Sequence, residues 1–253
     1  MKLLLFSLLF AGGMSLPFHF SHALTLAIDA GHGGSDAGAT RHGIKESDIT
    51  LEVARLLHEK LEKESSVRSF LTRSSDVSLG LQERVDLAHA HKADLFLSIH
   101  VNASSDARAE GAEFYFQNQL EPTEAAAYLA HQENQLNLEK DTTPATHELV
   151  DPSWPPALKA IFFDLLDQSR VRESFLLSKT LRENWLGHKR PKSVSVKQAP
   201  FHVVSHTHIP ATLVELGFLT NRSDLKSLQS QAYIETTVQS LYRGIVAFQK
   251  RAP

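Results

Sequence analysis

The chain has 253 residues, of which 42% are hydrophobic, and its 26 Lys and Arg against 29 Asp and Glu give a net charge of −3 at neutral pH. A nucleic-acid-binding domain normally presents a basic surface, so this balance argues against a nucleic-acid partner. The chain has no cysteine. This excludes a cysteine nucleophile, a thiolate metal site and a disulfide framework.

The first 23 residues have the features of a secretory signal peptide. Lys2 supplies a positive start, an apolar run extends from Leu3 to Met14, and Ser21-His22-Ala23 is a small-x-small cleavage site. The apolar run is too short to cross a bilayer. We therefore expect cleavage near Ala23 and a periplasmic or secreted protein; an uncleaved membrane anchor is the alternative.

Strand and helix patterns alternate through residues 24–253, which we expect to form one catalytic domain without an interdomain linker. Strands are predicted at 24–30, 66–72, 94–100, 111–116, 194–196 and 211–216, and helices at 47–62, 81–88, 175–185 and 234–249. Such alternation predicts the α/β class, with a mostly parallel twisted sheet covered by helices on both faces.

An insertion at about residues 117–173 interrupts this alternation, where a parallel α/β unit normally has a short connection. Helices are predicted within it at 124–137 and 157–167, the second with an apolar stripe of Leu158, Ile161, Phe162 and Leu165. The insertion could pack on the domain as a structural element. It could also be a mobile lid or self-inhibiting helix over the site, because long insertions beside strand ends are often functional.

Four residues that could build a catalytic metal site lie close to predicted strand ends: His32, Glu46, His100 and Glu215. A parallel sheet gathers such residues at the carboxyl ends of its strands. Two imidazoles and one carboxylate are a common catalytic Zn²⁺ shell. A second carboxylate nearby can move protons during metal-assisted hydrolysis. The pattern predicts a zinc hydrolase.

Each of these residues also has a structural interpretation. His32 could be a turn histidine beside a glycine-rich loop, Glu46 an acid favoured by a helix dipole, and His100 a hydrogen-bonded core residue. Glu215 is harder to explain in this way, because an unpaired carboxylate between apolar residues is costly to bury.

A serine-type mechanism has weaker support. Ser223-Asp224-Leu225-Lys226 matches the Ser-x-x-Lys pattern of penicillin-binding enzymes, but the companion Lys-Thr-Gly is absent. We interpret Ser223 as a helix N-cap and keep a serine-type carboxypeptidase as an alternative.

Several ordered motifs resemble those of the zinc-dependent N-acetylmuramoyl-L-alanine amidases of cell-division type, the amidase_3 family. In chain order they are Ile28 to Gly34 with Asp36, Gly38 and Ala39; Gly43 to Glu46; Leu71 to Arg73 with Asp76; Leu81 with Glu83 and Arg84; Ala93 to Ala103; Val196 to Phe201; and Ile209 to Asn221. The resemblance covers the chain from residue 24 onward, apart from the insertion.

The resemblance implies that His32, Glu46 and His100 bind Zn²⁺ and that Glu215 is the catalytic carboxylate. It implies cleavage of the amide between N-acetylmuramic acid and L-alanine of peptidoglycan stem peptides, in cell-wall remodelling or daughter-cell separation. The alternatives are a zinc or serine-type peptidoglycan peptidase, including a carboxypeptidase, and a catalytically inactive wall-binding relative.

The resemblance also bears on the insertion. Relatives with a comparable insertion hold a helix from it across the zinc cleft until an activator protein displaces it. We expect Glu148, with Asp151 as second choice, to be the carboxylate that reaches the metal position. We expect the protein to be a monomer.

Overall fold

The computed structural model describes residues 24–63, 67–118, 120–135, 153–187 and 194–251. The predicted leader, residues 1–23, lies outside this range. So do Glu148 and Asp151.

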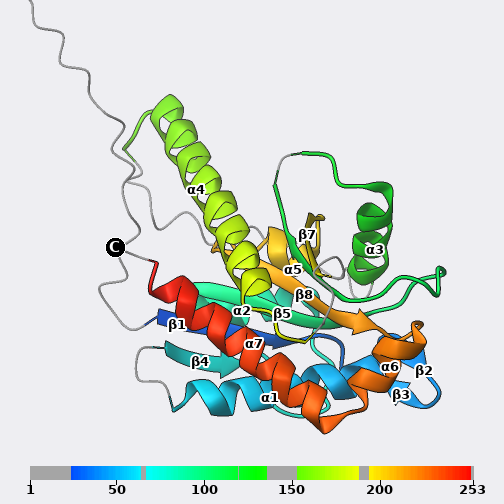
Figure 1. The fold of residues 1–253 in the computed structure, drawn as a ribbon. Coiled ribbons are helices and arrows are strands. Elements are labelled where there is room, and N and C mark those ends of the chain that lie inside the picture. The colour runs from blue at the N-terminus through cyan, green and yellow to red at the C-terminus, as the bar shows by residue number, and fades with distance from the viewer. Residues whose placement is uncertain (1–23, 64–66, 119, 136–152, 188–193, 252–253) are drawn as a thin grey trace, which may run out of the picture.

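The core of the molecule is a six-stranded sheet with the order β4-β1-β5-β8-β6-β7 (Figure 1). Its strands are β4 (Val67–Leu71), β1 (Leu24–Ala30), β5 (Leu95–Asn102), β8 (Ala211–Phe218), β6 (Ala112–Phe116) and β7 (Val194–Gln198). The first four are parallel, whereas β6 runs antiparallel to β8 and parallel to β7. The prediction of a mostly parallel sheet in an α/β domain is confirmed.

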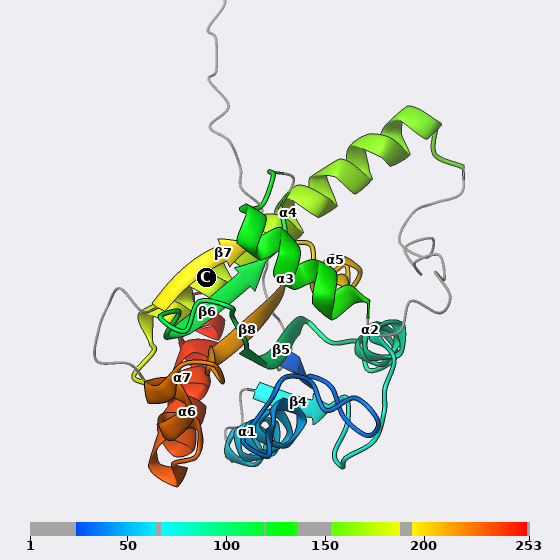
Figure 2. The same cartoon turned by 90° about the vertical axis from the view of Figure 1, so that its right-hand side faces the viewer.

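Helices cover both faces of the sheet, as Figure 2 shows in a view turned by 90°. One face packs against α1 (Glu46–Leu61), the carboxyl-terminal half of α4 (Pro156–Glu183), α6 (Arg222–Leu228) and α7 (Gln231–Gln249). The other packs against α2 (Leu81–Ala90), α3 (Glu124–Asn134) and α5 (His202–Ser205). A small hairpin of β2 (Thr40–Arg41) and β3 (Ile44–Lys45) precedes α1.

Helix α4 differs from the prediction of two separate helices at 157–167 and 175–185. It is one helix of 28 residues, because no glycine or proline lies between these segments to end it. Its carboxyl-terminal half is packed in the core, where Leu177 and Leu181 are each 1% exposed. Its amino-terminal half projects beyond the sheet (Figures 1 and 2), and Ile161 and Leu165 of the predicted apolar stripe are each 59% exposed.

The amino-terminal cap of helix α6 differs from the prediction. The cap of α6 is Asn221, whose side chain accepts hydrogen bonds from the backbone of Ser223 and Asp224, so the prediction of Ser223 as the N-cap was wrong. Asn221 is among the residue types preferred at this position, because its side-chain oxygen accepts hydrogen bonds from free amides of the first turn. Across the described ranges, no helix combines the length and apolar character needed to cross a membrane.

Candidate metal centre

Three of the four predicted site residues meet at the carboxyl end of the sheet. His32 follows β1, His100 lies near the end of β5, and Glu46 is the first residue of α1. Glu46 Oε1 lies 3.1 Å from both His32 Nε2 and His100 Nδ1. One potential ligand atom from each residue lies within 4.8 Å of the others, and all three residues are buried.

Two glycines make this close approach possible. A Cβ atom on Gly31 would lie 2.5 Å from His100 Nε2, and one on Gly38 would lie 2.7 Å from Glu46 Oε2. Gly38 also has a left-handed φ of 63°, which residues with a side chain rarely adopt. The glycine-rich motif after β1 is therefore required by the packing of the three side chains.

The hydrogen bonds around His32 fit a metal ligand. Its Nδ1 pairs with Asp36 Oδ2 at 2.8 Å, which is the contact that typically fixes the orientation of a metal-binding imidazole. Its Nε2 is buried and makes no hydrogen bond with any residue that the structure describes, although Glu46 lies 3.1 Å away. A nitrogen left open between buried acceptors suits a cation, and two histidines with one carboxylate match the donor set of catalytic zinc.

The electrostatics of the cluster formed by His32, Glu46 and His100 also favour a bound cation. Burial alone would lower the pKa of His32, but the carboxylates of Glu46 and Asp36 outweigh burial and raise its pKa to about 11. Burial would conversely raise the pKa of Glu46, yet His32 and His100 together bring it well below its usual range. The site thus binds positive charge strongly, which a metal ion would provide in place of a proton.

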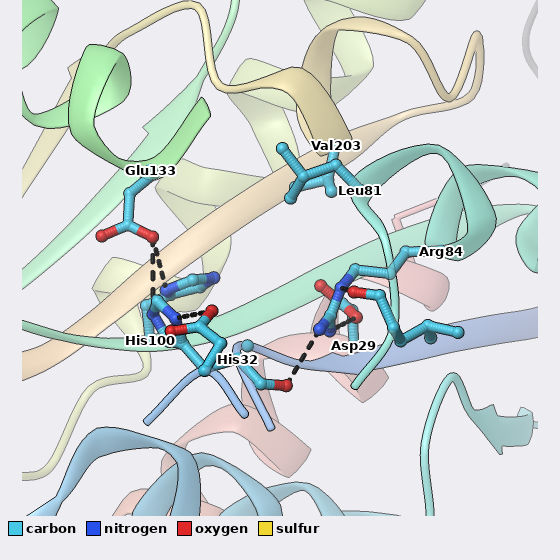
Figure 3. Close-up of a pocket in the computed structure, with 10 residues that line it drawn as sticks. Asp29, His32, Leu81, Arg84, His100, Glu133 and Val203 are labelled. Atoms are coloured by element: carbon cyan, nitrogen blue, oxygen red, sulfur yellow. Dashed lines mark hydrogen bonds and ion pairs between the residues drawn. The ribbon is translucent and has the colours of Figure 1, made fainter. Parts of the chain in front are cut away.

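Two buried arginines hold the backbone that carries His32. Arg84 donates from Nη1 to Asp29 Oδ1 at 2.7 Å and from Nη2 to the carbonyl of His32 at 2.9 Å (Figure 3). Arg73 donates from Nη2 to the carbonyl of Gly31 at 2.8 Å. These contacts give a physical role to the Thr72-Arg73 and Glu83-Arg84 motifs, because they fix the turn after β1.

Asp29 also supports the turn after β1. Its carboxylate also accepts hydrogen bonds from Thr72 Oγ1 at 2.6 Å and Ser98 Oγ at 2.7 Å. Burial would raise its pKa, but Arg84 and the two hydroxyls lower it below the ordinary value. Asp29 is therefore ionised and fully paired.

Glu215 lies in β8 directly opposite His100 in the β5–β8 register. It is 1% exposed, and its Oε2 has no hydrogen-bond partner in the described part of the chain. Burial and the nearby carboxylates of Glu46, Glu133 and Glu113 raise its pKa well above the usual value. A carboxyl group in this state is suited to accept and return a proton.

A further carboxylate, Glu133, reaches the site from α3 and was missed in the sequence. Its Oε2 lies 3.4 Å from His32 Nε2 and 3.5 Å from His100 Nδ1, and Figure 3 shows it pointing at the two rings. Burial and Glu46 raise its pKa. A signal for it exists: Glu133 follows Ala126 and Ala130 at helical spacing, so it shares their buried face.

Helix α3 is held over the site at its carboxyl-terminal end. Asn134 donates to the carbonyl of Pro200 at 2.8 Å and accepts from the backbone of His202 at 2.7 Å. Beneath Glu133 remains a cavity of about 20 Å³, lined by His32, His100 and Glu133 among others. This volume is roughly that needed for one water molecule.

Comparison with known proteins agrees with this geometry. Residues 26–247 match the family Amidase_3, N-acetylmuramoyl-L-alanine amidase. The chain is 31% identical over 229 residues to N-acetylmuramoyl-L-alanine amidase AmiC of Escherichia coli O6:H1, covering 89% of this chain and 52% of AmiC. It is 30% identical over 227 residues to AmiA of E. coli K12, covering 88% of this chain and 75% of AmiA. The chain thus spans about half the length of AmiC.

Solved structures show the same fold. N-acetylmuramoyl-L-alanine amidase AmiC2 of Nostoc punctiforme superposes with a TM-score of 0.65 at 25% identity, covering 91% of this chain and 99% of that one. An amidase from Clostridium difficile 630 gives a TM-score of 0.65 at 23% identity, over 92% of this chain and 100% of that one. The family match, the relatives and the shared fold together place this chain in the Amidase_3 family, whose members are hydrolases named as N-acetylmuramoyl-L-alanine amidases.

Proposed function

We propose that the protein is a zinc-dependent amidase that cleaves the bond between N-acetylmuramic acid and L-alanine in peptidoglycan. The observation that carries this proposal is the buried cluster of His32, Glu46 and His100 beside Glu215, in a chain of the Amidase_3 family. Zinc held by these three residues would supply a water of lowered pKa and a positive charge beside the carbonyl of the scissile amide.

The protein's own residues have separate roles in this reaction. His32, Glu46 and His100 hold the ion, and Asp36 keeps His32 in the required tautomer and orientation. Glu215 takes the proton of the attacking water and returns it to the leaving amine of L-alanine. Its Oε2 has no hydrogen-bond partner among the described residues and is available for this transfer.

The described conformation corresponds to an inhibited form of this enzyme. Glu133 occupies the space above His32 and His100, and α3 closes the approach to them. Substrate entry then requires α3 to move, which an activator protein can achieve if it binds the open form more tightly than the closed form. Glu133 fills the role that we expected for Glu148, which stays an untested prediction because it lies outside the described residues.

The exported location and the domain limits belong to the same proposal. A leader at 1–23, a catalytic domain at 24–253 and an insertion at about 117–173 fit a peptidoglycan hydrolase, because its substrate lies outside the cytoplasmic membrane. Within the described part, α3 and the projecting half of α4 belong to that insertion.

Product analysis tests the activity. Zinc-loaded protein, with Glu133→Ala to relieve the block, is incubated with purified sacculi, and the products are separated by mass. An amidase releases intact stem peptides and leaves sugar strands with free lactyl groups. Release of terminal amino acids or of shortened stems would support the peptidase alternatives instead, and absence of any cleavage would support a wall-binding role.

A further inference from the structure

A row of polar side chains crosses the sheet from the candidate metal centre to the edge strand β7, on the face that α3 covers. His100 of β5 pairs in register with Glu215 of β8, and Glu215 pairs with Glu113 of β6. Residues directly opposite each other on neighbouring strands point to the same face. Tyr115 shares this face because it lies two residues beyond Glu113. It pairs in register with Lys197 of β7, where the row ends.

Glu113 holds the outer end of this row together. Its Oε1 accepts a hydrogen bond from Lys197 Nζ, and its Oε2 accepts one from the Tyr115 hydroxyl at 2.6 Å. A lysine ammonium has three N–H donors. Among the described residues, Glu113 is the only hydrogen-bond acceptor that Lys197 contacts, and the Lys197 side chain is 36% exposed. Lys197 therefore has donors available to a molecule that lies along the row.

The proposed amidase reaction sets the direction in which the substrate crosses this row. Glu215 returns a proton to the leaving amine of L-alanine, so this amine lies on the Glu215 side of the scissile bond. The muramyl carbonyl then lies on the side of the metal ligands. Because the stem peptide continues from the amine, it extends away from His100, across β8 and β6 toward Lys197.

The distances along the row suit the first residues of the stem. Neighbouring strands are about 4.8 Å apart. Lys197 Nζ contacts a carboxylate of β6, which is the strand next to β8. One extended residue spans about 3.3–3.6 Å. When the amine of L-alanine lies at Glu215, the second stem residue therefore reaches Lys197.

The charges on this face admit either a charged or an uncharged oxygen. Lys197 and Glu113 form an ion pair without net charge. Glu46 and Glu133 add negative charge close to Glu215, but Glu46 belongs to the cation site and Glu133 leaves with α3 when a substrate enters. A carboxylate and a carbonyl can both accept a hydrogen bond from an ammonium group. The donors of Lys197, rather than its charge, thus define the subsite.

We propose that Lys197, oriented by Glu113, binds an acceptor oxygen of the second stem residue and so places the stem peptide for cleavage. The oxygen is the free carboxylate of this residue or the carbonyl of its amidated form. The inference rests on the proposed amidase function and adds to it the direction of the substrate and a residue that binds its peptide half.

Steady-state kinetics with a muramyl tetrapeptide test the proposal in full-length, zinc-loaded protein that carries Glu133→Ala to open the site. Lys197→Met should raise KM by about three- to tenfold, the effect of one hydrogen bond, and leave kcat nearly unchanged. Lys197→Arg, which keeps a donor, should retain most of the affinity. The control Lys179→Met removes an exposed lysine that pairs with Glu183 on α4, and it should change neither constant.

Product inhibition separates stem binding from a general structural effect. Lys197→Met should weaken inhibition by the free stem tetrapeptide by the same factor by which KM rises, and leave inhibition by N-acetylmuramic acid unchanged. A substrate amidated at the second stem residue identifies the oxygen: an equal effect on KM indicates the carbonyl, and an effect confined to the acidic form indicates the carboxylate. Adding Glu113→Gln to Lys197→Met removes the carboxylate left unpaired and replaces the single variant if that variant does not fold.

The proposal is overturned if the Lys197→Met variant, alone or with Glu113→Gln, cleaves the tetrapeptide with an unchanged KM. It is also overturned if the loss lies in kcat alone, or if inhibition by the two products weakens equally. Absence of cleavage by the parent Glu133→Ala protein would instead overturn the proposed amidase function, on which this inference rests.

Discussion

Asp29→Asn should destabilise the domain strongly, although Asp29 touches neither substrate nor metal. Its carboxylate is 1% exposed and accepts hydrogen bonds from Arg84, Thr72 and Ser98. Asparagine removes the charge that pairs with Arg84 and turns an NH₂ group toward donors. Breaking one side of a buried ion pair costs about 3–5 kcal/mol. At roughly 2–4 °C per kcal/mol for a domain of this size, the melting temperature should fall by about 6–20 °C.

The pH dependence gives a second, independent readout of the same reasoning. The pKa of Asp29 is lowered below its ordinary value of 3.8 in the folded state. The ionised carboxylate therefore stabilises the fold above about pH 4, and this contribution is lost as the pH falls below that value. The stability difference between the original protein and Asp29→Asn should shrink in acid.

Chemical unfolding of the metal-free proteins measures both effects, with the exposed Asp86→Asn on α2 as the matched control. A loss below about 1 kcal/mol at pH 7, or a loss that stays constant down to pH 3, would show that Asp29 does not act through its ionised pairing with Arg84. Because Arg84 also binds the carbonyl of His32, chelator competition should show weaker zinc affinity in the variant.

The remaining predictions concern the metal centre and its cover. Glu133→Ala should raise basal hydrolysis of sacculi by about 10–100-fold, the shift expected when a charge-assisted contact that favours the closed form is removed. The control Glu124→Ala, at the exposed start of the same helix, should leave the rate unchanged. Equal rates in the two variants would exclude Glu133 as the group that blocks the site. Glu215→Gln should keep its zinc, measured by elemental analysis, while turnover falls by about 10²–10⁴-fold, the usual contribution of a general base; loss of zinc would instead make Glu215 a ligand. His100→Ala should lose both zinc and activity because two remaining ligands hold the ion poorly, and full activity in a folded variant would remove the zinc mechanism.

Much of the fold could be predicted from the sequence because its strands are apolar and clearly bounded. Strand β5 is buried along its whole length, and its largely apolar sequence, beginning with Leu95, Phe96 and Leu97, is typical of a central parallel strand. The antiparallel direction of β6 relative to β8 was not predicted; the insertion follows β6 and connects it to β7, to which it is parallel. The continuity of α4 was also missed, because its two halves have different environments and hence different apolar patterns.

The cluster of His32, Glu46 and His100 was predictable for a related reason. His32 follows β1 and His100 lies near the end of β5, and these two strands are neighbours in the sheet, so strand order brings the residues together. Glu133 was not found, because it reaches the site through the placement of α3, which depends on side-chain contacts such as those of Asn134. The sequence of a mostly polar helix does not show which other element of the fold one of its carboxylates will face.

The position of Glu46 at the first residue of α1 has a consequence for metal binding at the proposed site. His32 and Glu46 bracket residues 33–45, which contain the β2–β3 hairpin. An ion held by both residues closes this segment into a ring, much as a covalent cross-link would, and removes conformational freedom that the segment otherwise keeps. The free energy of ion binding then includes the free energy of ordering residues 33–45, so the two are linked. Substitutions within residues 33–45 that favour or disfavour the closed ring would therefore change metal affinity without altering a single ligand atom.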